Sequence, residues 1–227
     1  MKTEWSGVFP AVTTQFRPDL TLDLDLTAKH LEALIQSGIS GLVLLGSLGE
    51  NVSLTREEKL EVIRLGKSVS NGRVPVVSGV AEYGGHLAAD YMKAAESAGA
   101  DGFMVMPAMV YRADRGEALA HYRTAAAATN LPIIVYNNPL GYHVDVTAEM
   151  FVELAEVPNL VAIKESSGDV RRITDLINTV GDRYVLFAGV DDLALECAFL
   201  GAKGWIAGIG LAFPAENQRL WDLAVAG

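Results

Sequence analysis

The sequence predicts one (β/α)8 barrel, an α/β fold of the TIM-barrel class, that spans residues 1–227 as a single domain. Eight short apolar segments alternate with eight longer amphipathic segments, which is typical of a parallel sheet with helical crossovers. No linker interrupts the series, so we expect the eight units to close on themselves. The alternative is an open doubly wound sheet, which usually has a glycine-rich turn after its first strand; residues 13–18 show none.

Each expected strand is a few residues long and rich in Val, Ile, Leu, Phe or Tyr, as strands buried on both faces are. The expected strands are residues 8–14, 41–45, 74–78, 102–106, 133–136, 160–164, 184–188 and 204–207.

Four intervening segments end at a residue that favours the left-handed conformation of a helix C-cap. These helices are expected at residues 26–37, 55–70, 86–98 and 115–129, with stops at Gly38, Asn71, Gly99 and Asn130. The second helix opens with the spacing of a capping box, from Thr55 to Glu58.

Four further helices are expected to begin near residues 147, 169, 191 and 214. Asp191 and Asp192 are interpreted as caps of the seventh helix rather than as metal ligands. The eighth helix runs to residue 227, where the sequence ends.

The composition narrows the class of partner. The formal net charge is −10, and the one adjacent basic pair, Arg171–Arg172, is interpreted as a solvated helix start, whereas binding to nucleic acid or to anionic membranes needs basic clusters. No apolar run approaches the roughly 20 residues of a membrane helix, and the N-terminus lacks the apolar core of a signal peptide. We therefore expect a cytoplasmic protein with a small-molecule partner, and neither nucleic acid nor membrane.

Cysteine and histidine offer little chemistry. The single cysteine, Cys197, has apolar neighbours, which favours a buried, inert thiol over a nucleophile. The four histidines are scattered, without a zinc-binding motif. We expect no metal and no cofactor.

Catalytic side chains of such barrels lie at the C-terminal ends of the strands. If the β-branched Val161 and Ile163 face the helices, the alternation of side chains turns Leu160, Ala162 and Lys164 toward the barrel axis. Only a neutral amine attacks a carbonyl, and burial in an apolar barrel favours the neutral form. The resulting Schiff base is an electron sink. The alternative is a lysine that reaches solvent at the strand end.

Tyr136 ends the fifth expected strand. If Ile133 and Val135 face the helices, Ile134 and Tyr136 face inward, at the same rim as Lys164. A phenol there could move protons to and from a substrate. The alternative is an aromatic ring that only closes the barrel mouth.

Three glycine-containing segments follow strands. Residues 46–50, Gly-Ser-Leu-Gly-Glu, could form a nest of backbone N–H groups for a carboxylate, or only a tight turn. Gly189 and the segment 208–210, Gly-Ile-Gly, fall where barrels often bind phosphate, or where the rim only packs closely.

Four motifs carry a family resemblance over the whole chain: residues 7–14 (Gly-Val-Phe-Pro-Ala-Val-Thr-Thr), 46–50, 136–139 (Tyr-Asn-Asn-Pro) and 163–169 (Ile-Lys-Glu-Ser-Ser-Gly-Asp). In this order and spacing they resemble the dihydrodipicolinate synthase / N-acetylneuraminate lyase family. The resemblance implies a catalytic TIM barrel that forms Schiff bases with pyruvate-type 2-keto acids or their cyclic imines, and a homotetramer.

The resemblance also implies roles for individual residues. Lys164 would be the Schiff-base lysine and Tyr136 the proton relay. The Ser47 hydroxyl and the Leu48 amide would hold the substrate carboxylate. Gly189 and Ile206 would line the pocket through their backbones.

The chain departs from dihydrodipicolinate synthase itself at three places. Leu48 replaces a second hydroxyl residue, and Gly141 stands where an arginine would bind the carboxylate of the second substrate. In the synthase a pair of tyrosines follows the proline after the fourth strand, but here Pro107 is followed by Ala-Met-Val-Tyr. Tyr111, in a shifted loop, is the candidate to replace that pair. The C-terminal helical region of the family is absent as well.

Residues 46–51 and 106–111 look most like the branch of 1-pyrroline-4-hydroxy-2-carboxylate deaminases of hydroxyproline degradation. This branch releases ammonia and 2-oxoglutarate semialdehyde. The alternatives are an aldolase or dehydratase of 2-keto-3-deoxy sugar acids, a dihydrodipicolinate synthase-like enzyme, and a ligand-binding barrel without catalysis.

Overall fold

The computed structural model describes residues 3–108 and 110–227 and confirms the (β/α)8 barrel. The strands are β1 (Gly7–Pro10), β2 (Leu42–Leu44), β3 (Val76–Val80), β4 (Gly102–Val105), β5 (Ile133–Asn137), β6 (Leu160–Glu165), β7 (Val185–Ala188) and β8 (Gly204–Ala207).

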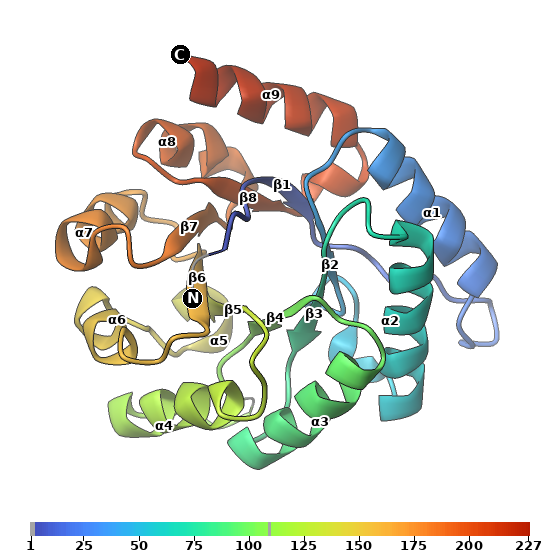
Figure 1. Ribbon diagram of the computed structural model, residues 1–227, viewed down its shortest axis with the longest axis horizontal. Helices are drawn as coiled ribbons and strands as arrows, with labels where there is room; N and C mark the ends of the chain where they lie inside the picture. Colours follow the sequence, from blue (N-terminus) through green and yellow to red (C-terminus); the bar gives the residue numbers. More distant parts are fainter. Residues whose placement is uncertain (1–2, 109) are drawn as a thin grey trace.

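The strands form a ring in sequence order with the helices outside it (Figure 1). Neighbouring strands are parallel throughout, including β8 beside β1. The ring closes between β1 and β2 through a parallel bridge from Ala11 to Val43, where the Val12 N–H donates to the Val43 carbonyl at 2.8 Å. All strand C-termini therefore meet at one mouth.

The helices are α1 (Leu24–Gln36), α2 (Arg56–Ser70), α3 (Gly85–Ser97), α4 (Arg115–Ala126), α5 (Pro139–Tyr142), α6 (Ala148–Leu154), α7 (Arg171–Val180), α8 (Ala194–Phe199) and α9 (Pro214–Ala226). Each strand leads into one outer helix, and α5 is an additional single turn between β5 and α6. Short 3-10 turns, η1 (Asn51–Ser53), η2 (Asp191–Leu193) and η3 (Ile209–Leu211), follow β2, β7 and β8. Within the described residues no helix is long and apolar enough to cross a membrane.

Most of the expected helix stops are confirmed. Gly38, Asn71 and Gly99 have φ angles of +85°, +47° and +105°, in the left-handed region. The capping box at Thr55 and Glu58 is present, with both reciprocal hydrogen bonds.

The expected stop at Asn130 is wrong. Helix α4 ends at Ala126, and Asn130 is not among the residues with a positive φ. The Thr129 hydroxyl accepts a hydrogen bond from the Leu131 N–H at 3.0 Å, so a side-chain turn redirects the chain in place of a left-handed cap.

Two strands differ from expectation by two or more residues at one or both ends, and the other strand bounds agree to within one residue. Strand β3 begins at Val76 because Pro75 has no N–H to contribute to the ladder. Strand β1 ends at Pro10, well before Thr14, whose hydroxyl donates to the Gly49 carbonyl of the next βα loop at 2.7 Å.

Two apolar cores are separated by the sheet. The outer core lies between strands and helices and contains Leu160 and Ile163. The inner core fills the barrel; its buried members are Phe9, Ala11, Val43, Val77, Ala81, Met104, Met106, Ile134, Tyr136, Val161, Ala162, Phe187 and Ile206.

The expected faces of β6 need one correction. Leu160 belongs to the outer core and Val161 to the inner one, the reverse of the prediction. The cause is a register shift, because Ile133 pairs with Leu160 while Ile134 pairs with Ala162, so that Val161 is an extra residue. Beyond this bulge the alternation follows the prediction.

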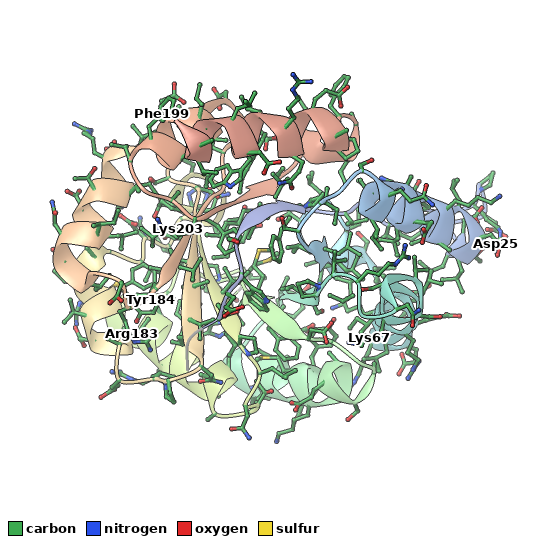
Figure 2. All side chains as sticks on the ribbon, turned by 45° about the horizontal axis from the view of Figure 1, so that its top comes forward. Asp25, Lys67, Arg183, Tyr184, Phe199 and Lys203 are labelled. Carbon is green, nitrogen blue, oxygen red and sulfur yellow. The ribbon has the colours of Figure 1, made fainter. Side chains whose placement is uncertain are left out.

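At the N-terminal end of the barrel, one side chain ties the segment before β7 to the segment before β6. The Arg183 guanidinium, beside Tyr184 just before β7, donates to the carbonyls of Ala155, Val157 and Leu160 at 2.6–3.0 Å (Figure 2). In TIM barrels this end stabilises the fold, whereas the opposite mouth carries chemistry.

Candidate active site

Lys164 and Tyr136 come together at the C-terminal mouth. They are paired residues of β6 and β5, and each is only 6% exposed. The Lys164 Nζ lies over the Tyr136 ring, 4.0 Å from its centroid. A buried amine and a phenol in contact are suited to attack on a carbonyl and to proton transfer.

The environment of Tyr136 favours release of its proton. Burial acts to raise the pKa of the phenol, but the charge of Lys164 and polar contacts outweigh it, so the pKa lies below its usual value. One contact is a hydrogen bond from Asn138 Nδ2 to the phenol oxygen at 3.2 Å. Another is the nearby Ser166 hydroxyl, which is buried and has no hydrogen-bond partner of standard geometry among residues 3–108 and 110–227.

A polar network holds the two catalytic strands from the outside. Asn137 is fully buried, and its Nδ2 donates to Glu165 Oε2 at 2.9 Å and to Asp145 Oδ1 at 3.3 Å. Its Oδ1 accepts from the Val146 N–H at 2.9 Å. Because Asn137 and Glu165 directly follow Tyr136 and Lys164, the network fixes the relative position of that pair. Sequence reasoning missed it, although a polar residue directly after each inward one was a signal.

The loop after β2 has a backbone that requires glycine. A Cβ on Gly49 would lie 2.9 Å from both the Leu45 nitrogen and the Val12 oxygen. Asn51 Nδ2 donates to the Leu45 carbonyl at 2.8 Å, which ties the loop to the end of β2. This anchoring explains how the loop presents Ser47 at the mouth. The binding of a carboxylate by Ser47 and the Leu48 amide stays a prediction.

A second tyrosine enters the site from α5. The Tyr142 hydroxyl is hydrogen-bonded to the Ser47 hydroxyl. Its ring packs edge-on against Tyr136, with centroids 5.5 Å apart and an interplanar angle of 84°. Sequence reasoning missed Tyr142, because the contact with Ser47 spans 95 residues.

Gly189 lies against the lysine. A Cβ at this position would be 1.9 Å from Ser166 Oγ and 3.0 Å from Lys164 Cε. Ile206 is buried in the inner core below the mouth. Both positions are compatible with the expected backbone lining.

The expected phosphate-type loop after β8 is already occupied by a side chain. Asp191 Oδ1 accepts from the Gly208 N–H at 3.0 Å and from the Trp205 indole at 3.1 Å, and Oδ2 accepts from the Ile209 N–H at 2.9 Å. The interpretation of Asp191 as a helix cap is therefore wrong, since its carboxylate joins the β7 and β8 loops. Neither η2 nor α8 has a side-chain cap, so the same interpretation of Asp192 is wrong as well.

Tyr111 is not brought to Lys164 by the structure. It is 85% exposed and lines a separate hollow between α3 and α4, together with Tyr83 and His121. Met109, in the same segment, lies outside the described residues. A role for Tyr111 in substrate binding stays a prediction.

Cys197 is buried on α8, and this burial, with the charges of Glu165 and Glu196, raises the pKa of its thiol to about 11. The thiol is therefore protonated at neutral pH and a poor nucleophile, as expected. Among residues 3–108 and 110–227, no group of three or more His, Cys, Asp or Glu side chains is placed to hold a metal ion.

Comparison with known proteins gives a consistent family. The chain matches the model of the dihydrodipicolinate synthetase family over residues 4–227. The 4-hydroxy-tetrahydrodipicolinate synthase of Sorangium cellulosum is 35% identical over 224 residues, which cover 98% of this chain and 74% of that protein. That of Salinibacter ruber is 34% identical over 215 residues, covering 94% and 71%. The crystal structure of the chloride-inhibited dihydrodipicolinate synthase from Acinetobacter baumannii, complexed with pyruvate, is 31% identical and matches with a TM-score of 0.94, covering 97% and 76%.

Proposed function

Because this chain belongs to the dihydrodipicolinate synthetase family, a family of lyases, we propose that Lys164 forms a Schiff base with C2 of a small 2-keto acid or its cyclic imine. The observation that carries the proposal is the buried Lys164 Nζ over the Tyr136 ring at the C-terminal mouth. The pyruvate complex of the Acinetobacter baumannii relative supports this class of substrate.

The residues around Lys164 divide the work of the reaction. The neutral amine attacks C2, and Tyr136 supplies the proton that lets oxygen leave as water or the ring nitrogen leave as an amine. The protonated imine then accepts the electron pair released when a bond to C3 breaks. Ser47 and the Leu48 amide hold the substrate carboxylate, and the backbones of Gly189 and Ile206 line the pocket.

At the finer level, we propose deamination of 1-pyrroline-4-hydroxy-2-carboxylate. Transimination by Lys164 opens the ring, and loss of a C3 proton expels the 4-hydroxyl. Tautomerisation and hydrolysis of both imines yield ammonia and 2-oxoglutarate semialdehyde. The proposal is supported by Gly141, which has no side chain to bind the carboxylate of a second substrate.

One second candidate is favoured by an observation. The curated relatives of 32–35% identity are named 4-hydroxy-tetrahydrodipicolinate synthase, which supports condensation of a Lys164-bound 2-keto acid with an aldehyde. Leu48 and Gly141 argue against this candidate. The homotetramer implied by the family resemblance stays a prediction, as does the contribution of Tyr111.

The test is covalent trapping together with product analysis. The protein is incubated separately with pyruvate, a 2-keto-3-deoxy sugar acid and 1-pyrroline-4-hydroxy-2-carboxylate. Samples with borohydride are used to measure the mass of the Lys164 peptide, and samples without it are used for product analysis. We expect an adduct on Lys164 and, from the cyclic imine alone, release of ammonia. Pyruvate release from the sugar acid would favour an aldolase, and a condensation product formed when pyruvate is supplied together with an aldehyde would favour the synthase. No adduct with any substrate would reject Schiff-base chemistry.

Gly189→Ala is expected to damage the reaction more than the fold. The added methyl group would displace the Ser166 hydroxyl and the Lys164 chain, and a misplacement of about 1 Å at a reacting group can cost about 10²-fold in rate. We expect the rate of adduct formation with pyruvate to fall at least about tenfold. Gly116→Ala is the matched control, because its Cβ would meet no atom closer than 3.4 Å. Equal rates in both variants would show that the lysine can move aside freely.

A further inference from the structure

The two adjacent arginines at the start of α7 have different surroundings. The Arg171 side chain is 83% exposed, and its guanidinium pairs with Asp169, two residues earlier. The Arg172 side chain is only 22% exposed and pairs with Asp145, 27 residues away, in the segment between β5 and α6. The interpretation of this pair as a solvated helix start is therefore confirmed for Arg171 and wrong for Arg172.

Asp145 joins Arg172 to the catalytic strands. One oxygen of its carboxylate, Oδ2, accepts from the Arg172 guanidinium, and the other, Oδ1, accepts from Asn137 Nδ2 at 3.3 Å. The same Nδ2 donates to Glu165 at 2.9 Å. Asn137 and Glu165 directly follow the catalytic pair on β5 and β6. Arg172 thus lies at the outer end of a series of polar contacts that reaches both catalytic strands.

This network needs a positive charge. The single Nδ2 group of Asn137 donates to the carboxylates of Asp145 and Glu165, and two like charges held around one neutral amide repel each other. Burial acts to lower the pKa of Arg172, but a hydrogen bond and the charges of nearby carboxylates, among them Asp145 and Glu165, outweigh burial and raise that pKa. The guanidinium therefore supplies a positive charge that interacts with both carboxylates.

We propose that Arg172 is a positioning residue for Schiff-base formation, because it neutralises the two carboxylates that share the Asn137 amide. This role rests on the proposed function. With the guanidinium in place, Asp145 and Glu165 both accept from Asn137, and the ends of β5 and β6 are held in register. Without it, repulsion drives one carboxylate away from the amide, and the amine and the phenol of the catalytic pair shift relative to each other. Arg172 acts through Asn137, so it is not itself a catalytic residue.

The contact that Arg172 maintains is sensitive to small displacements. The Lys164 Nζ lies 4.0 Å from the centroid of the Tyr136 ring. A misplacement of about 1 Å at a reacting group can cost about 10²-fold in rate. The ion pair of Arg172 with Asp145 is itself partly exposed, and such pairs contribute little to the free energy of unfolding. We therefore expect the loss of Arg172 to affect the reaction more than the stability of the fold.

Two other roles for Arg172 make different predictions. A purely structural role, joining α7 to the segment before α6, predicts that loss of the arginine lowers stability and leaves the reaction rate of the folded protein unchanged. Direct contact with the substrate predicts a higher half-saturating substrate concentration at an unchanged limiting rate. A positioning role predicts a lower limiting rate at an unchanged half-saturating concentration.

Exchange of the C3 hydrogens of pyruvate in D2O measures both kinetic quantities. The Schiff base on Lys164 loses a C3 proton to give the enamine, and a deuteron from the solvent then returns to C3. The rate above that without protein is followed against pyruvate concentration, and urea unfolding measures stability. The variants are Arg172→Met, which removes the charge, Arg172→Lys, which keeps it, and Arg171→Met, the matched surface control. Arg172→Met is also combined with Asp145→Asn, which removes one carboxylate charge but keeps an oxygen that can accept from Asn137.

We expect Arg172→Met to lower the limiting exchange rate at least about tenfold, with a half-saturating pyruvate concentration within about twofold of wild type. Its urea midpoint should stay within about 0.5 M of wild type. Arg171→Met should match wild type. Arg172→Lys and the double variant should each be at least about threefold faster than Arg172→Met, because the first restores the positive charge and the second relieves the repulsion.

A limiting rate in Arg172→Met within about twofold of wild type overturns the positioning role, as does a raised half-saturating concentration at a normal limiting rate. An unfolded Arg172→Met beside a folded Arg171→Met overturns it in favour of a structural role. A double variant no faster than Arg172→Met also overturns it, because the charge of Asp145 would then be irrelevant. Absence of both exchange and borohydride-trapped adduct in the wild type instead overturns the proposed function, and the positioning role with it.

Discussion

Lys164→Ala is expected to abolish the borohydride-trapped adduct and to lower turnover at least about 10³-fold. The reason is that the variant has no amine to form the Schiff base, and a water molecule cannot form one in its place. Stability should hold or rise. The lysine is 6% exposed, so its removal takes a polar amine out of an apolar barrel and ends the cost of desolvating that amine. Steady-state kinetics, intact-protein mass and urea unfolding measure the three effects.

Two further variants sharpen the result. Lys164→Arg keeps a positive charge over Tyr136, but its guanidinium stays protonated, so we expect it to be as inactive as alanine. Lys203→Ala removes an exposed lysine just before β8, at the N-terminal end of the barrel, opposite the active-site mouth (Figure 2). We expect it to leave adduct formation and turnover unchanged. Turnover above about 1% of wild type in both Lys164 variants would show that another group carries the chemistry.

Asn137→Leu is expected to cost about 2–5 kcal/mol of unfolding free energy. Leucine has a similar volume, so the loss comes from polar groups. The Val146 N–H loses the Asn137 oxygen, and among the described residues the buried Glu165 carboxylate keeps the hydrogen bond from the Ser167 N–H at 2.7 Å. Each buried group left unpaired costs about 1–3 kcal/mol, and more when charged. Adduct formation should also slow, because β5 and β6 lose the link that follows Tyr136 and Lys164.

Asn217→Leu is the matched control in another buried asparagine. Asn217 Nδ2 donates to the Phe213 carbonyl at 2.7 Å, but its buried Oδ1 has no hydrogen-bond partner in the part of the chain that the structure describes, so leucine there also removes an unsatisfied atom. We expect a loss within about 1 kcal/mol. Equal losses in the two variants, measured by urea unfolding, would mean that the network at Asn137 contributes no more than an ordinary buried amide.

The sequence by itself determined the architecture and the central pair of the site. Strand and helix periodicity are local properties, so the eight βα units, the stops at Gly38 and Gly99 and the capping box could be predicted from neighbouring residues. The inward positions of Lys164 and Tyr136 followed from alternation along strands, because both lie beyond the bulge at Val161. The family motifs supplied the chemical expectation.

The tertiary structure alone decided which side chains meet across the mouth. Ser47 and Tyr142 are 95 residues apart in the sequence. The Asp191 carboxylate accepts hydrogen bonds from the Gly208 and Ile209 N–H groups, which the sequence analysis had considered as a phosphate site. Such contacts depend on strand register and on the conformation of several loops at once. Local periodicity predicts neither the strand register nor the loop conformations. The partner of a side chain depends on how the closed barrel aligns its strands, and not on the residues next to it in the sequence.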